Sequence, residues 1–172
     1  NSAGCGAQIK AYGHLLRHDP AYAARARRFV SKVEDVAEFL ARVGLTAPLG
    51  RVERTVTYQD ACHLAHGQGI RTQPRELLGQ VPGLTVVEMR DSTRCCGSAG
   101  IYNILQPETS ATVLEAKLTN VCATGAECVV ASNPGCLLQI NMGLRDRGLD
   151  LDGKHLVDIL DEAITAGAHL PA

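Results

Sequence analysis

The second part of the chain alternates short apolar runs with helical segments, and this alternation constrains the fold more than any other feature. The runs rich in β-branched and aromatic residues lie at 55–58, 84–88 and 127–131, with a short extended piece near His155. Helical apolar spacing follows each of them, beginning near 74, 107, 137 and 157. Strands that alternate with helices predict a parallel sheet with right-handed crossovers. We therefore expect an α/β fold in which helices flank a small parallel sheet.

The first part of the chain shows only helical spacing, over residues 6–46. Asp19-Pro20 marks one helix start, and Ser31 is expected to cap a further helix that ends at Gly44. Pro48 and Gly50 then indicate a linker. This pattern predicts a helical segment over residues 1–50 and an α/β domain over residues 51–172.

Charge and composition exclude several classes of protein. The 172 residues include 17 Lys and Arg against 18 Asp and Glu, which gives no electrostatic argument for a nucleic-acid or anionic-membrane partner. No apolar run approaches the roughly 18–20 residues that a membrane span needs. Seven cysteines are too few for a secreted disulfide scaffold, and their number is odd. They favour metal or redox chemistry in a reducing compartment.

Four of the cysteines follow the predicted strands. Cys62 comes after the first strand, Cys95 and Cys96 after the second, and Cys136 after the third. Because the carboxyl ends of parallel strands meet at one edge of the sheet, we expect these thiols to converge on a ligand site.

Spacing alone leaves four interpretations of these thiols open. Four cysteines can form a tetrahedral zinc site, although zinc ligands usually come in spaced pairs. The adjacent pair Cys95-Cys96 splays its side chains and favours a cluster with several irons, which thiolates also ligate. The pair could instead form a redox disulfide, or the cysteines could be small buried hydrophobes. We favour the metal or cluster interpretation.

The remaining candidates are interpreted structurally. Cys122 shares a helical face with Leu114 and Leu118, and Cys128 lies inside an apolar strand, so we expect both to be buried. His63 and His66, three residues apart, both follow Cys62 closely, but loop histidines more often cap or hydrogen-bond than ligate. Motifs for nucleotides or for a hydrolase nucleophile are not found.

The cysteine motifs resemble a known family, the cysteine-rich CCG domain. Cys62, Cys95-Cys96-Gly97 and Asn133-Pro134-Gly135-Cys136 carry the resemblance. This domain occurs in heterodisulfide reductase, in lactate-utilisation iron–sulfur proteins and in the glycolate oxidase iron–sulfur subunit. The segments DACHLAHGQG (60–69), QPRELL (73–78) and CCGSAG (95–100) are most similar to the last of these. The resemblance covers essentially the whole chain.

The resemblance implies a cofactor and a ligand set. It implies an iron–sulfur cluster, of 4Fe-4S type, held by Cys62, Cys95, Cys96 and Cys136. The heterodisulfide reductase pattern ends in C-x-x-C, whereas Asn133 replaces the first cysteine of that pair here. A four-cysteine cluster is therefore a safer expectation than a five-cysteine one.

The beginning of the chain carries traces of a second repeat. Gly4-Cys5 aligns with Gly135-Cys136, so Cys5 resembles the last metal ligand of an upstream CCG repeat. On this interpretation the chain is the C-terminal part of a longer subunit, and residues 1–50 are the helical remainder of the truncated repeat. The helices before Gly44 should then expose an apolar face.

The resemblance also implies a role and partners. The chain would be a non-flavin electron-transfer subunit of a glycolate oxidase or dehydrogenase complex. It would pass electrons from a flavin-containing partner subunit to a respiratory acceptor, and would be inactive alone. The implied location is cytoplasmic, with peripheral association at the inner face of the cell membrane as an open alternative. A zinc-stabilised interaction domain and a thiol–disulfide module at Cys95-Cys96 remain the rival functions.

Overall fold

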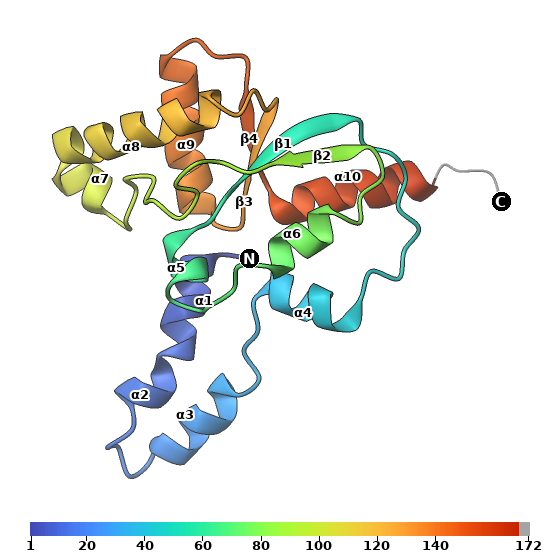
Figure 1. Cartoon of the computed structure of the whole chain (residues 1–172). Helices are drawn as coiled ribbons and strands as arrows, with labels where there is room; N and C mark the ends of the chain where they lie inside the picture. Colours follow the sequence, from blue (N-terminus) through green and yellow to red (C-terminus); the bar gives the residue numbers. More distant parts are fainter. Residues whose placement is uncertain (169–172) are drawn as a thin grey trace.

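The computed structural model describes residues 1–168 and contains a four-stranded sheet in which every pair of neighbouring strands is parallel (Figure 1). The strand order is β2-β1-β3-β4. The bounds are β1 (Arg54–Gln59), β2 (Leu84–Val87), β3 (Cys128–Ala131) and β4 (Asp152–His155). The predicted fold class is confirmed. The last four residues of the predicted domain 51–172 lie outside the described part of the chain.

Helices precede the sheet and connect its strands. Two short ones, α5 and α7, were not predicted. The bounds are α1 (Ala3–Lys10), α2 (Tyr12–Leu15), α3 (Ala23–Val30), α4 (Val36–Val43), α5 (Cys62–Ala65), α6 (Gln73–Leu78), α7 (Tyr102–Leu105), α8 (Pro107–Cys122), α9 (Pro134–Asp146) and α10 (Leu156–Ala168). None of these helices is both long and apolar enough to cross a membrane.

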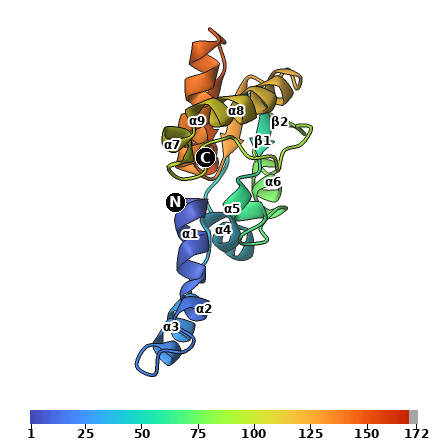
Figure 2. The ribbon, with the colours of Figure 1, turned by 90° about the vertical axis from the view of Figure 1, so that its left-hand side faces the viewer.

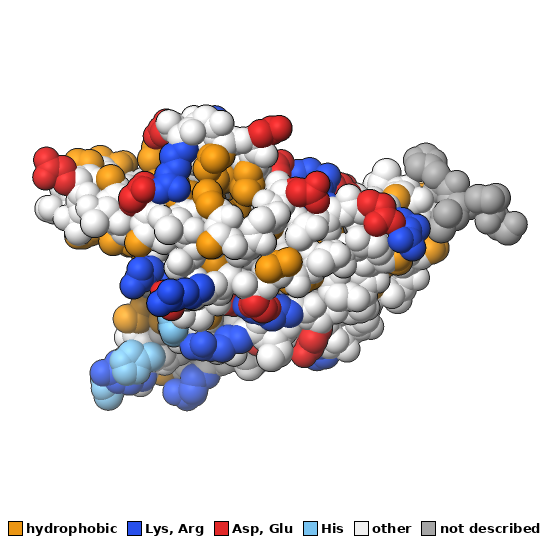
Figure 3. Space-filling view, turned by 45° about the horizontal axis from the view of Figure 1, so that its top comes forward, with side chains coloured by type: hydrophobic (Ala, Val, Ile, Leu, Met, Phe, Trp, Pro, Cys, Tyr) orange, Lys and Arg blue, Asp and Glu red, His pale blue; other side chains and the backbone are white. Residues whose placement is uncertain are grey.

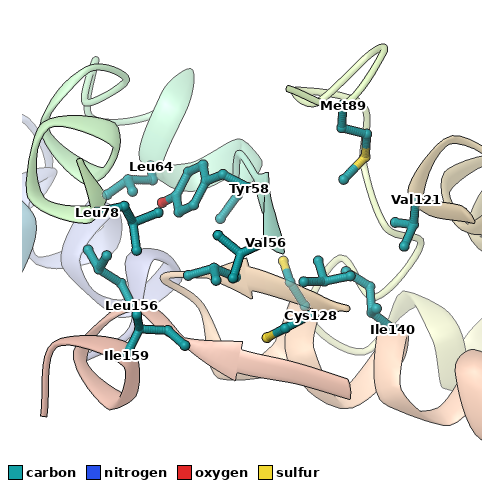
Figure 4. Close-up of a cluster of buried hydrophobic side chains, with 14 of the residues drawn as sticks. Val56, Tyr58, Leu64, Leu78, Met89, Val121, Cys128, Ile140, Leu156 and Ile159 are labelled. Atoms are coloured by element: carbon teal, nitrogen blue, oxygen red, sulfur yellow. The ribbon is translucent and has the colours of Figure 1, made fainter. Parts of the chain in front are cut away.

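The sheet is covered on both faces, which explains its apolar strands. Helices α8 and α9 pack against each other over one face, and α6 and α10 pack against each other over the other (Figure 1). Figure 4 shows Tyr58, Leu78 and Leu156 on one side of the core and Val121 and Ile140 on the other. Every residue of β3 is buried, as expected for a central strand between two helical layers.

The N-terminal helices differ from the prediction at two helix starts. Helix α3 begins at Ala23 rather than at Pro20, although Asp19 Oδ1 accepts from the backbone N–H groups of Ala21 and Tyr22. Asp35, rather than Ser31, caps α4: its Oδ1 accepts from the backbone N–H of Ala37, and the Glu38 side chain accepts from the backbone N–H of Asp35. This reciprocal arrangement satisfies two free donors at the helix start. Ser31 instead follows α3, where its hydroxyl donates to the carbonyl of Arg28. Gly44 ends α4 as predicted, with φ +81°.

Two apolar surfaces are exposed. As expected, one belongs to the helices before Gly44, and α2 and α3 project away from the sheet (Figure 2). Lys, Arg and His side chains gather at the same projecting end (Figure 3). The second surface, on α7, α9 and the residue before α7, was not predicted; it consists of Ile101, Tyr102, Ile104, Leu105, Leu138 and Met142.

Candidate functional site

The register of the sheet brings the cysteine-bearing segments together. Gln59 pairs with Ala131, and Ala131 pairs with His155, so β1, β3 and β4 end at one level. Cys62 begins α5 just beyond β1, and Cys136 lies in the first turn of α9 just beyond β3. Strand topology alone therefore carries both thiols to the carboxyl edge of the sheet.

A cavity of about 350 Å³ lies at this edge, and the predicted cysteines surround it. At ~30 Å³ per water molecule, this is far more space than one metal ion occupies. Each of the seven cysteines is a free thiol. The residues that line the cavity are Ser2, Gly4, Cys5, Cys62, His63, Cys95, Cys96, Ser98, Ala99, Gly100, Asn133, Gly135 and Cys136. A larger cavity of about 450 Å³, between α8 and α9, has no cysteine in its lining.

The turn that carries Cys95 and Cys96 is shaped by Gly97. Gly97 has φ +92°, and a Cβ there would lie 2.5 Å from the carbonyl oxygen of Ser110. Its backbone N–H points to the Sγ of Cys95, 3.4 Å away, and its carbonyl accepts from the Ser110 hydroxyl at 2.9 Å. Only glycine allows this close approach and this backbone angle together.

A buried polar chain fixes Ser110 in turn. Gln139 of α9 donates through Nε2 to the Ser110 hydroxyl at 3.0 Å, and Asn103 donates through Nδ2 to Oε1 of Gln139 at 3.0 Å. Ser110 and Gln139 are both buried. Because a buried polar group without a partner is costly, this chain holds α8, α9 and the Cys95-Cys96 turn in one arrangement.

Asn133, which replaces a cysteine of the related C-x-x-C pattern, faces the cavity. Its Nδ2 donates to the Sγ of Cys136 at 3.3 Å. Its Oδ1 accepts from the backbone N–H of Gly4 at 3.2 Å and from the Ser2 hydroxyl at 3.1 Å. The side chain thus joins a site cysteine to the beginning of α1.

The start of α1 forms one wall of the cavity. The backbone N–H of Ala3 donates to the carbonyl of Ser132, and Gln68 donates through Nε2 to the carbonyl of Ala3 at 3.0 Å. These bonds tie α1 to the segments after β3 and β1, and they place the exposed Cys5 on the cavity lining. Five thiols therefore line the cavity, and Cys5 is the exposed one of the five.

Hydrogen bonds between the sulfurs divide the site into two kinds of cysteine. Hydrogen bonds from the Cys62 thiol and then from the Cys96 thiol lower the pKa of Cys95, and the backbone N–H of Gly97 lowers it further. Cys96, with Asn133, likewise lowers the pKa of Cys136. Conversely, these hydrogen bonds and burial raise the pKa of Cys62 and of Cys96. The direction of the shift alternates along this row: the pKa is raised at Cys62 and Cys96 and lowered at Cys95 and Cys136. Cys95 and Cys136 are therefore the two that lose a proton more readily.

This donor set fits an iron–sulfur cluster. Thiolates are its usual ligands, and N–H groups directed at sulfur are among the features that tune its potential. Over residues 1–168, no three His, Cys, Asp or Glu side chains are grouped as a site for a single metal ion. The thiols line a cavity and do not converge on the position of a single ion.

Comparison with known proteins agrees with these motifs. The model of the cysteine-rich CCG domain matches residues 56–141. The chain belongs to this family. The CCG-domain chain is 41% identical, over 95% of its length, to a probable glycolate oxidase iron-sulfur subunit of Bacillus subtilis (strain 168), of which it spans 38%. It is also 30% identical to lactate utilization protein A of Macrococcus caseolyticus, with 96% of the chain and 68% of that protein covered.

One structural prediction about the cysteines of this CCG domain is wrong. Cys122 is exposed, because it is the last residue of α8 and the buried face of that helix ends at Val121. Nη1 of Arg147 lies 4.0 Å from the Cys122 sulfur. Cys128 is fully buried, as predicted.

The two histidines beside Cys62 differ from each other. His63 lines the cavity, and its Nδ1 lies 3.6 Å from the Sγ of Cys62. His66 instead pairs with Nη2 of Arg71 at 3.1 Å.

Sequence reasoning missed three polar residues that support the site. Ser110, Gln139 and Lys117 all lie on the buried faces of α8 and α9. The sequence did contain a signal for Lys117, since it shares its helical face with Leu114 and Val121. A charged residue on an apolar face is unusual enough to suggest a specific role.

Proposed function

We propose that this chain is the iron–sulfur electron-transfer part of a glycolate oxidase-like flavoenzyme. The observation that carries the proposal is the cavity at the carboxyl edge of the sheet, whose lining includes Cys62, Cys95, Cys96 and Cys136. The names of the two relatives support the same role. When bound, an iron–sulfur cluster accepts and releases single electrons.

The residues around the cavity would hold and orient such a group. The four thiolates would be its ligands, in a cluster of 4Fe-4S type. The Gly97 N–H and the Asn133 amide would donate to ligand sulfurs, which spreads their negative charge. Cys5, on the cavity lining, is proposed as the ligand of a separate cluster in an upstream repeat of a longer subunit, with residues 1–50 and 51–172 as the two parts of this chain.

The partners follow from the same proposal. A flavin-containing subunit would oxidise the 2-hydroxy acid, glycolate or lactate, and deliver electrons to this site. The electrons would then leave to a respiratory acceptor. We propose a cytoplasmic location. Cell fractionation tests whether the protein also associates peripherally with the membrane.

Anaerobic purification with iron, sulfide and zinc analysis and EPR tests the proposal. We expect iron and sulfide in the native chain, and a large loss of both after single Cys→Ser changes at Cys62, Cys95, Cys96 or Cys136. Cys122→Ser is the matched control and should retain both. Stoichiometric zinc without iron or sulfide would support the interaction-domain alternative instead. A Cys95–Cys96 disulfide that reforms after each reduction, in iron-free protein, would support the thiol–disulfide alternative.

A further inference from the structure

Lys117, in the middle of α8, is fully buried, with 0% of its surface exposed. Its ammonium donates to the carbonyl of Asp91 at 2.8 Å and to that of Ser92 at 3.1 Å, and the sulfur of Met89 lies at 3.8 Å. These contacts use all three donors of the lysine. Within residues 1–168, no carboxylate lies within 4.0 Å of it.

A buried ammonium without an ion pair is unusual, because losing hydration is costly for a charge. Burial lowers the pKa of Lys117 to about 8, and this shift is opposed first by Cys96 and then by Asp60 and Asp91. The group therefore remains mostly charged at neutral pH. Carbonyl dipoles solvate it, but they supply no compensating negative charge.

The nearby carboxylates are already accounted for. Arg75 binds both oxygens of Asp60, at 2.9 and 2.8 Å. Asp91 contributes its carbonyl to Lys117, and the residue itself is exposed to solvent. The cysteines are the remaining groups near Lys117 that can carry negative charge: Cys96 raises the pKa of Lys117, and Lys117 in turn lowers that of Cys136.

The position of Lys117 relative to the Cys95-Cys96 turn is equally specific. Asp91 and Ser92 lie just before the turn, and Asp91 has φ +52°. Ser110, two helical turns before Lys117 on α8, binds the carbonyl of Gly97 just after it. Helix α8 thus holds both sides of the turn, one side through a neutral hydroxyl and the other through a cation.

We propose that Lys117 is the internal counter-cation of the cysteine site. It favours the gathering of thiolates and, where a cluster is bound, favours the uptake of an electron. Lys117 is a positioning residue that acts through the turn and through its charge, and this role rests on the proposed function. Uptake of one electron, from a flavin partner or from dithionite in vitro, adds one negative charge to the site. A fixed positive charge in a poorly solvated interior stabilises that reduced state more than the oxidised one.

The test is an EPR-monitored redox titration of the iron-loaded chain and its variants. Lys117→Gln removes the charge but still offers N–H donors, through its amide. Lys117→Met removes both the charge and the donors, and Lys117→Arg keeps the charge. In both neutral variants we expect an equilibrium constant for reduction at least tenfold smaller, which is a midpoint about 59 mV lower for a one-electron couple. For Lys117→Arg, the equilibrium constant for reduction should stay within about threefold of the native value. This corresponds to less than half of that shift in the midpoint.

Arg51→Gln is the matched control. It removes one positive charge from an exposed side chain that precedes β1, at the opposite edge of the sheet from the thiols. It should leave the midpoint unchanged. Unaltered midpoints in both neutral variants would overturn the proposal, because a purely structural lysine would change the urea unfolding midpoint but not the reduction equilibrium.

Loss of the cluster in the variants would also test the proposal. If neither neutral variant holds iron, retention by Lys117→Arg supports the need for charge, whereas loss in Lys117→Arg as well overturns it. If the native chain holds zinc and no iron, the proposed function fails separately. Competition with a chelating dye then tests Lys117: zinc affinity at least tenfold weaker in the neutral variants supports the counter-cation, and equal affinity overturns it.

Discussion

The side-chain amide of Asn133 donates to the sulfur of Cys136 across 3.3 Å. This contact stabilises the thiolate form, and it is one reason that the pKa of Cys136 lies below the usual value of a thiol. The same side chain accepts from the backbone N–H of Gly4. Asn133 is therefore placed to control both the charge of a site cysteine and the position of α1.

Asn133→Asp should weaken metal binding at neutral pH. A carboxylate keeps the acceptor for Gly4 but repels the Cys136 thiolate, so the pKa of Cys136 rises and more of this sulfur is protonated at pH 7. Iron incorporation should fall at pH 7 and partly recover at pH 8.5. Asn141→Asp, a matched change elsewhere on α9, should show no such recovery with pH; equal behaviour of the two variants would contradict the prediction.

Gly97→Ala should destabilise the fold more than Gly100→Ala. Both residues have positive φ, which costs an alanine ~1–2 kcal/mol. Only at Gly97 does the added Cβ meet backbone, 2.5 Å from the Ser110 oxygen, whereas nothing lies within 4 Å at Gly100. We expect a loss of ~3 kcal/mol or more in the free energy of unfolding for Gly97→Ala, against ~1 kcal/mol for Gly100→Ala. Urea denaturation of the metal-free proteins measures both, and equal losses would show that the contact with Ser110 is unimportant.

The Asp60–Arg75 pair predicts acid sensitivity. Burial alone would raise the pKa of Asp60. The hydrogen bonds from Arg75 and Ser92, together with the positive charges of Arg75 and Arg71, outweigh burial and lower the pKa below the unfolded value of about 4. The stabilisation is therefore complete above that value and disappears as the pH falls through the folded pKa. Asp60→Asn should cost about 3 kcal/mol at pH 7 and less at pH 3. Glu34→Gln, in the exposed pair with Arg42, is the control and should change stability little. A loss that is the same at both pH values would refute the assignment.

Cys5→Ser should leave the bound iron near the native amount. Cys5 is exposed, whereas Cys96 and Cys136 are buried, and four thiolates complete the usual ligand set of a cluster. Iron and sulfide analysis beside Cys136→Ser makes the comparison. A loss as large as that of Cys136→Ser would instead make Cys5 a fifth ligand of this site.

The sequence was sufficient to predict the parts of the fold that depend on local pattern. The continuous apolar run of β3 indicated a strand buried on both faces, and parallel order implied that Cys62 and Cys136 would reach one edge. Helix ends were less predictable, because Ser31 and Asp35 are both capable caps. In the structure Asp35 is the cap, and Glu38, three residues further along, completes the capping box.

Contacts between distant segments could not be predicted. The hydrogen bond from Ala3 to Ser132 and the chain from Asn103 through Gln139 to Ser110 depend on how helices are oriented around the sheet. The exposure of Cys122 likewise depends on where α8 passes beyond its neighbours. Helical periodicity identifies a face but does not show how far the covering layer extends.

The attachment of α1 beside the thiols has a practical consequence for work with this protein. A tag or fluorophore joined to Asn1 would lie next to the opening around Cys5, where it can obstruct reconstitution of the cluster. A polyhistidine tag there can also contribute ligands of its own. Helix α10 starts beside the end of β4 and runs back along the sheet to Ala168, so fusions at the other terminus are carried away from the cysteines (Figure 1). Affinity handles and surface-immobilisation chemistry therefore belong at the carboxyl end.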